Sequence, residues 1–340
     1  MPSPHLSRRR LLHGLAGVGV AVAGWQPRNA AQIVPSAPSI PTTFTAPIGW
    51  AGQVPGDGFR IGHGFACENT WFNRGWWHTG EDWYAVDRDT GDAVIYAVAA
   101  GEVVYVGFDY PGRVIIVRHA DDLFSAYGHL NFATAVRQGQ AVAAGDTLGS
   151  VLLQVRRRAP SHLHFELRTF LTTPLVNGDR PSHGVKCGTN CPPGPGYWPI
   201  TAPEHPTAMG WRNPTHQQVK MALEQGIPDG IKVRPQSAAM GRTVALHAEP
   251  DGGSTVRKHL TLGPDDAFAL RDLSAGDPGS TGTSAEAYGY WLRIALGDEV
   301  GGWVQAAIPS DRETGSDGRP SSIDRPFLLV SAEGNAAPRP

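Results

Sequence analysis

The chain has 340 residues, with 29 basic and 31 acidic side chains and a formal net charge of −2. This length allows about two domains with a sizeable core, which excludes a disordered tail or a disulfide-stapled miniprotein. The balanced charge excludes a global basic field for nucleic acid. The 42 Gly and 29 Pro residues favour strands joined by tight turns. The 13 His residues outnumber the 3 Cys, and imidazoles are common metal ligands and proton carriers, so their placement decides which chemistry is available.

Residues 1–31 are expected to be an export signal. Ser7, Arg8 and Arg9 precede an apolar run at 11–23, which is too short to span a bilayer, where roughly 20 residues are needed, but fits a signal peptide. The arginine pair resembles the twin-arginine signal. We therefore expect an extracytoplasmic protein (periplasm, cell wall or secreted) with no stable membrane insertion after signal removal. An uncleaved membrane anchor is the alternative.

After a Pro/Thr/Ser-rich tether at 32–49, the segment 50–200 alternates strand-like runs with short turns. The runs are rich in β-branched and aromatic residues, which favour strands, and the turns between them are short. The runs lie at 93–106, 113–119, 123–130, 141–155 and 162–170. This pattern predicts an all-β domain built on an antiparallel sheet.

The second half of the chain begins with one predicted helix. Residues 213–226 have Pro214 in the first turn and Gly226 just past the end, and they are placed in a linker at 201–240. A second β-rich unit is expected at 241–310. The polar tail at 311–340 is interrupted by Gly and Pro and is expected to be poorly ordered.

Three short motifs place His and Asp on or beside consecutive predicted strands. They are His78-Thr-Gly-Glu-Asp82, Tyr127-Gly-His129-Leu and His162-Leu-His164. Residues two apart on a strand face the same side, so His162 and His164 share a face. Each motif alone also fits a chance spacing, a polar surface pair or a hydrogen-bonded histidine at a strand end. A sheet that carries all three can bring them together, which predicts a metal site.

The residues from 78 to 167 resemble the lysostaphin/LytM-type zinc endopeptidases. That family has H-x-G-x-D, a P/A-V-x-A-x-x-G-x-V segment, an H-x-D/G…Y-x-H-L segment and H-L-H-F-E, and this chain has HTGED, AVIYAVAAGEVVYVG, VRHADDLFSAYGHL and HLHFEL. One departure precedes HLHFEL, where Arg156, Arg157 and Arg158 stand in place of a Gly/Ser-rich turn. This departure bears on substrate preference rather than on catalysis.

The resemblance implies that His78, Asp82 and His164 bind one zinc ion and that His129 and His162 are the catalytic histidines. Two imidazoles and a carboxylate leave the fourth tetrahedral position of zinc open for water, whose pKa falls towards about 7 on the metal. The two unligated histidines are then available to take the proton of that water and to stabilise the oxyanion. Which of them is the base stays open.

Alternatives for the same residues concern Glu166 and the other histidines. Glu166 shares a strand face with His164 and could compete as a carboxylate ligand, and we interpret it as support for the ligands. A cupin-type site is another interpretation of H-x-H, but it needs a Glu three or four residues further on, and here the spacing is two. His63, His119 and His183 have no partner at a useful spacing and are expected to have surface or packing roles.

Residues 241–310 resemble a small SH3-like β-barrel in their E-P-D-G-G turn and G-W-V strand. The resemblance implies a module that binds cell-wall peptides, and a structural spacer is the alternative. In an exported protein, Cys187 and Cys191 can close a small disulfide loop. Cys67 is then unpaired, unless it joins one of them.

These features predict an exported zinc metalloendopeptidase that hydrolyses peptide bonds in peptidoglycan. Its expected partners are peptidoglycan peptides and not nucleic acid. The alternative is a non-catalytic relative that binds wall material or activates another hydrolase. Such relatives usually lack one or more ligands, and none is missing here. The cleaved bond and the oligomeric state stay open.

Overall fold

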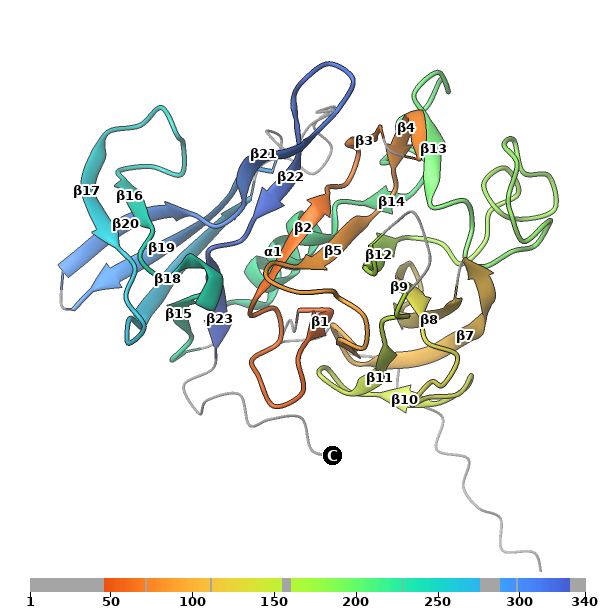
Figure 1. Cartoon of the computed structure of the whole chain (residues 1–340), viewed down its shortest axis with the longest axis horizontal. Coiled ribbons are helices and arrows are strands. Elements are labelled where there is room, and N and C mark those ends of the chain that lie inside the picture. Colours follow the sequence, from red (N-terminus) through yellow and green to blue (C-terminus); the bar gives the residue numbers. More distant parts are fainter. Residues whose placement is uncertain are drawn as a thin grey trace, which may run out of the picture. The chain divides into compact units, whose positions relative to one another are not determined.

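The computed structural model describes residues 46–330, without residues 71, 111, 155–159, 228, 276–287 and 298. The expected export signal, the tether up to residue 45 and the loop with Arg156, Arg157 and Arg158 lie outside the described residues. The described part is nearly all β and has one α-helix, α1 (Pro214–Gln225) (Figure 1). This confirms the predicted fold class.

In the described part of the chain, the strands form four sheets with antiparallel pairing. The first sheet has the order β1 (Ile48–Gly49), β6 (Val94–Tyr96), β11 (Thr147–Ser150). A second small sheet has the order β13 (Tyr197–Pro199), β4 (Asn73–His78), β3 (Glu68–Asn69). Since β1 pairs with β6 and buries Ile48, the last residues of the expected tether belong to the fold.

The central sheet positions the site. Its order is β10 (Ala141–Val142), β7 (Gly101–Tyr110), β8 (Gly112–Ala120), β9 (Leu123–Leu130), β12 (Leu163–Arg168), β5 (Glu81–Ala85), β2 (Phe59–His63), β22 (Pro320–Asp324), β21 (Ile308–Thr314), and β14 (Trp211–Arg212) pairs with β12. Each predicted run in 50–200 overlaps at least one of the observed strands. The run at 93–106 divides into β6 and β7, with residues 97–100 between them. Gly101 begins β7 and packs so closely on the carbonyl of Arg118 that a side chain there would collide with it.

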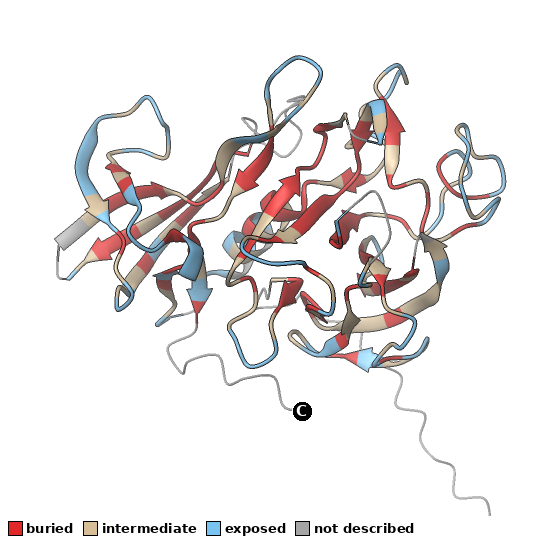
Figure 2. Ribbon diagram, viewed as in Figure 1, coloured by how far each residue is buried: buried red, intermediate tan, exposed pale blue. Residues whose placement is uncertain are grey.

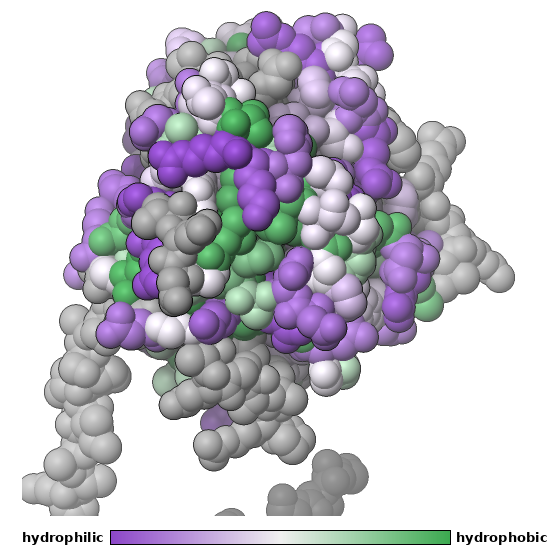
Figure 3. Space-filling model, turned by 90° about the vertical axis from the view of Figure 1, so that its left-hand side faces the viewer, coloured by the Kyte–Doolittle hydropathy of each residue, from purple (hydrophilic) through white to green (hydrophobic). Residues whose placement is uncertain are grey.

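A fourth sheet holds most of the second β-rich unit. Its order is β17 (Val256–Thr261), β16 (Thr243–His247), β20 (Glu299–Gln305), β19 (Tyr290–Leu296), β18 (Phe268–Ala275), β15 (Lys232–Pro235), β23 (Phe327–Val330). A short 3-10 helix, η1 (Ser237–Ala239), follows β15. No strand pairing closes this sheet into a barrel among the residues that are described, so the SH3-like assignment stays a prediction. Figure 3 shows the end of the molecule at the left of Figure 1, where apolar residues gather and hydrophilic residues surround them.

Helix α1 begins and ends where the sequence predicts. The Asn213 side chain accepts a hydrogen bond from the backbone N–H of His216, which satisfies one of the free donors of the first turn. Pro214 occupies the first helical position, and Gly226 ends the helix at a φ of 81°, in the region that favours glycine. The prediction of this helix is confirmed.

The prediction of a poorly ordered tail from residue 311 is wrong as far as Val330. Residues 308–330 contain three strands, β21, β22 and β23. The few apolar residues of this polar stretch are the ones that anchor it, since Ile323 is fully buried opposite Ile61 of β2 and Phe327 is 4% exposed. The chain thus returns from the second unit to extend the central sheet. Residues 331–340 lie outside the described part.

The core lies along the inner strands of the central sheet, where Figure 2 shows the buried residues concentrated. Ile61, Tyr127 and Phe165 have no exposed surface, and Trp83 has 1%. Burial of each such side chain contributes about 1.5–3 kcal/mol. Packing of these buried side chains stabilises the strands that carry the polar motifs.

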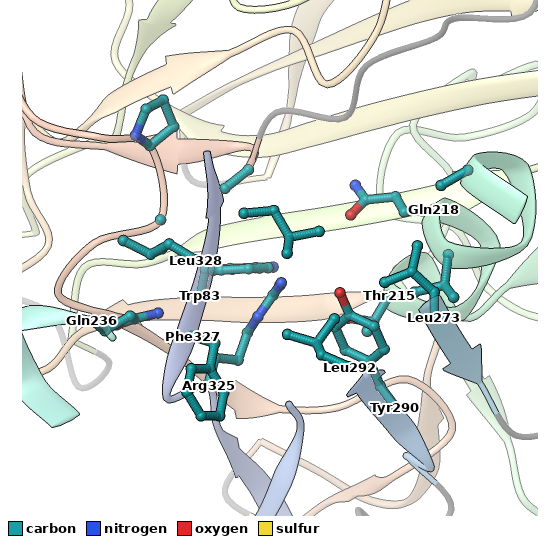
Figure 4. Close-up of a pocket in the computed structure, with 16 residues that line it drawn as sticks. Trp83, Thr215, Gln218, Gln236, Leu273, Tyr290, Leu292, Arg325, Phe327 and Leu328 are labelled. Carbon is teal, nitrogen blue, oxygen red and sulfur yellow. The ribbon is translucent and has the colours of Figure 1, made fainter. Parts of the chain in front are cut away.

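Trp83 follows Asp82 on β5, so the two side chains point to opposite faces of the sheet. On the Trp83 side lies a cavity of about 90 Å³ between β5, α1 and the C-terminal strands (Figure 4). The Arg325 guanidinium lies over the Trp83 ring there, 4.7 Å from its centroid. This cavity therefore lies on the face of the sheet opposite Asp82 and the cluster of histidines.

Candidate metal centre

The sheet register brings the three sequence motifs to one place. Asp82 of β5 pairs with His164 of β12, and His164 pairs in turn with Gly128 of β9, the neighbour of His129. Residues directly opposite on paired strands carry their side chains on the same face. Motifs about 80 residues apart in the chain thus meet on adjacent strands.

Three donor atoms converge at the centre of this row. Nε2 of His78 lies 2.9 Å from Nδ1 of His164, and Oδ1 of Asp82 lies 3.2 Å and 3.1 Å from the same two atoms. The residues are 0%, 4% and 1% exposed, respectively. Donors around a tetrahedral zinc with bonds of about 2.0–2.1 Å lie about 3.3 Å apart. Two imidazole nitrogens and one carboxylate oxygen at these separations are a donor set that fits a single zinc ion.

The electrostatics of the cluster favour the charge states that bind metal at two of its members. Burial alone would raise the pKa of Asp82, but the neighbouring His78 and His162 and the hydrogen bond from His164 outweigh it and hold that pKa well below its usual range. Burial lowers the pKa of His78. An ionised carboxylate and a neutral imidazole are the forms in which these side chains coordinate metals.

Glu166 lies next to the cluster and has its own partners. Its Oε1 accepts hydrogen bonds from Nε2 of His164 at 3.1 Å and from the Thr79 hydroxyl at 2.6 Å. Its Oε2 accepts from the Trp211 indole at 3.2 Å and from Arg168 at 3.4 Å. With both oxygens engaged, this carboxylate faces Nε2 of His164 rather than the three converging donors, as its interpretation as ligand support requires.

The two predicted catalytic histidines lie beside the three donors. Nδ1 of His162 donates to the carbonyl of Pro160 at 2.9 Å, and its Nε2 lies 3.8 Å from Oδ2 of Asp82. A carbonyl oxygen only accepts, so in the neutral ring the proton is on Nδ1 and Nε2 is an acceptor. The His129 ring lies 4.5 Å from the His162 ring and 6.3 Å from the His164 ring, centroid to centroid. All five predicted site residues are therefore neighbours.

His129 has an unusual backbone. Its φ is 62°, in the left-handed region that residues other than glycine rarely adopt. For an ordinary residue this conformation costs about 1–2 kcal/mol. It falls at the register shift between β8 and β9, where Leu130 pairs with Arg113 and Tyr127 with Ile115.

Sequence reasoning missed His63 and Glu313. His63 ends β2, is 3% exposed, and has its Nδ1 4.0 Å from Oδ2 of Asp82. Its Nε2 lies 3.0 Å from Oε2 of Glu313, on β21. The sequence around His63 has no motif, and only the pairing of β2 with β5 and β22 brings these side chains to the site.

His119 and two of the three cysteines have structural partners. His119 is 1% exposed and hydrogen-bonded to the Ala100 carbonyl and the Ser125 hydroxyl, which is the predicted packing role. Cys187 and Cys191 form a disulfide, and Cys67 is buried and unpaired.

Three donors that could hold one metal ion meet on an antiparallel sheet, and comparison with known proteins identifies the family. Residues 77–179 match the model of Peptidase family M23. The lipoprotein NlpD of Yersinia enterocolitica is 42% identical over 79 residues, which are 22% of this chain and 75% of that protein. The chain belongs to peptidase family M23.

Other relatives share the same region. The murein hydrolase activator NlpD of Escherichia coli is 42% identical over 83 residues, which are 23% of this chain and 20% of that protein. The chain spans 12% to 29% of the length of the first curated relatives it matches. Lysostaphin of Staphylococcus simulans, an antimicrobial peptidase of known structure, aligns over 80% of this chain and 95% of its own length, with 12% identity and a TM-score of 0.33.

None of the helices in the described ranges has the length and apolar character needed to cross a membrane.

Proposed function

We propose that this protein is an exported zinc endopeptidase that hydrolyses peptide bonds in cell-wall peptidoglycan. The observation that carries the proposal is the convergence of His78 Nε2, Asp82 Oδ1 and His164 Nδ1, with separations of 2.9 to 3.2 Å, next to two more histidines. Membership of a peptidase family and relatives named as lipoproteins and murein hydrolase activators support the reaction class, the substrate and an extracytoplasmic location.

In this proposal His78, Asp82 and His164 hold the ion. When bound, zinc polarises the scissile carbonyl and lowers the pKa of a water towards about 7. His162 takes the proton of the attacking water on Nε2, the nitrogen left as an acceptor by the bond of Nδ1 to Pro160. His129, whose ring lies beside that of His162, donates a hydrogen bond to the oxyanion.

Digestion of isolated sacculi tests this function. Purified chain lacking residues 1–31 and loaded with zinc should release soluble peptide fragments, which mass spectrometry identifies together with the cleaved bond. The variants His78→Ala and His164→Ala should release none and should lose stoichiometric zinc. Intact sacculi after treatment with zinc-loaded wild-type protein would exclude the endopeptidase.

A second candidate, activation of another wall hydrolase, is favoured by the relatives named murein hydrolase activators. The complete set of five His and Asp residues argues for catalysis instead. Adding an independent wall amidase to the same assay distinguishes the activator from the endopeptidase. An activator increases amidase activity without releasing fragments alone, and it does so equally in His78→Ala.

We also propose that residues 241–310 bind cell-wall peptides, on their resemblance to SH3-like modules. Co-sedimentation of the zinc-free full chain with sacculi tests this role, and failure to co-sediment would leave the unit as a spacer.

Twin-arginine export stays a prediction from Arg8 and Arg9. Export that is unchanged in a chain with lysine at both positions would contradict it.

A further inference from the structure

The two oxygens of Asp82 face different neighbours. Oδ1 lies against His78 and His164, whereas Oδ2 lies 3.8 Å from Nε2 of His162 and 4.0 Å from Nδ1 of His63. The orientation of the carboxylate, and with it the direction of Oδ1, therefore depends on the groups that surround Oδ2. Among these groups, His63 is the one to which the proposed function assigns no part.

His63 is held from its far side by Glu313. Nε2 of His63 lies 3.0 Å from Oε2 of Glu313, while Oε1 of Glu313 lies 3.7 Å from Nη2 of Arg60. The side chains of His63 and Glu313 are 4% and 12% exposed. The contact does not have the geometry of a hydrogen bond, so it acts through close approach and charge in a largely buried site. Glu313 thus closes off the side of the His63 ring that faces away from Asp82.

The strand that carries Glu313 is itself fixed at two points. The β21–β22 hairpin pairs with β2 through Ile61 and Ile323. Beyond Glu313, the hydroxyl of Thr70 donates to the carbonyl of Thr314 at 3.1 Å, and the backbone N–H of Ser316 donates to the Glu68 carboxylate at 3.0 Å. Glu68 lies on β3, the partner of the strand that ends at His78. The hairpin is therefore tied to the elements on both sides of the site.

We propose that His63 and Glu313 are positioning residues for Asp82, so that the C-terminal hairpin is a working part of the metal centre. This inference rests on the proposed function, in which Asp82 is a metal ligand. Partners that orient ligands typically change metal affinity by 10- to 100-fold when they are removed. Glu313 acts on Asp82 through His63 and has no contact with the three donor atoms itself.

Zinc affinity of the full chain tests the role of Glu313. Glu313→Gln keeps the shape of the side chain and removes its charge, and it should weaken zinc binding about tenfold or more in competition with a chromophoric chelator. Asp311→Asn removes the same charge from an exposed position on the same strand and should leave zinc affinity unchanged. Thermal unfolding of the metal-free proteins shows whether the variants are folded, and a purely structural role would change only this measurement.

The path through His63 is tested by a double-mutant cycle. His63→Phe keeps a ring but removes both nitrogens, and it should weaken zinc binding at least as much as Glu313→Gln. Because Glu313 acts through His63, Glu313→Gln should add no further loss in the His63→Phe background. Additive losses, or zinc affinity in Glu313→Gln equal to that of the wild type, overturn the positioning role alone. A wild-type chain that binds no zinc overturns the proposed function as well.

Discussion

Nε2 of His164 donates a hydrogen bond of 3.1 Å to Oε1 of Glu166, two residues further along the same strand. The alternation of β12 places both side chains on one face. Because this bond occupies Nε2, the other nitrogen, Nδ1, is the one that meets His78 and Asp82. The H-x-H-x-E spacing thus selects the nitrogen that His164 offers to a metal.

Replacing Glu166 should weaken the metal centre without removing a ligand. Glu166→Gln retains the shape but takes away the charge that orients His164, so zinc affinity should fall by roughly 10- to 100-fold. Competition with a chelator measures this change. Trp211→Phe removes only one of the hydrogen bonds to Glu166 and should have a smaller effect. A Glu166→Gln variant with wild-type affinity would contradict the supporting role.

Loss of His162 should separate catalysis from metal binding. His162→Ala removes the proposed base, so kcat for peptidoglycan hydrolysis should fall by about 10²- to 10⁴-fold. Zinc content should stay at one ion per chain, because His162 is not among the three converging donors. Kinetics and metal analysis on the same sample measure both. His259→Ala, at an exposed position on β17, serves as the control. Equal loss of zinc and activity would make His162 a ligand instead.

Gly80 sets how closely β5 approaches β12. A Cβ at this position would collide with the carbonyl oxygen of Phe165 and lie 2.9 Å from Cγ of Glu166. Gly80→Ala should therefore lower the free energy of unfolding by about 1–3 kcal/mol and should also weaken zinc binding, because Asp82 and His164 would move apart. Gly184→Ala meets no atom within 4 Å and is the matched control. Urea unfolding of both variants measures the difference. Similar stabilities would show that the strands adjust to the added methyl group.

His119 should contribute to acid sensitivity. Burial lowers its pKa from 6.5 to about 4. Between these values the unfolded chain binds a proton that the folded chain does not, so stability is complete above pH 6.5 and falls as the pH drops through about 4. The depressed pKa corresponds to about 3 kcal/mol. In His119→Gln, denaturant unfolding between pH 7 and pH 4 should show a shallower loss, and an unchanged pH dependence would rule out this contribution.

Local sequence patterns predicted the elements that depend on near neighbours. Helix α1 follows from Asn213, Pro214 and Gly226, because capping and φ preferences act within a few residues. Strands β7, β8, β9, β10 and β12 of the central sheet follow from runs of β-branched and aromatic residues, whereas β2 and β5 lie outside the predicted runs. The C-terminal tail was mispredicted because its anchor, Ile323, pairs with Ile61, more than 250 positions earlier in the chain, and no local pattern carries that information.

The sequence by itself determined which donor types each short motif offers, and the two-residue period of a strand places His162 and His164 on one face. Only the tertiary structure decided how these motifs meet, through the pairing of β5 with β12 and β2. It also decided that His63 and Glu313 lie beside Asp82. The physical reason is that a donor type is a property of one residue, whereas a separation of about 3 Å between donors is set by strand register across the whole fold.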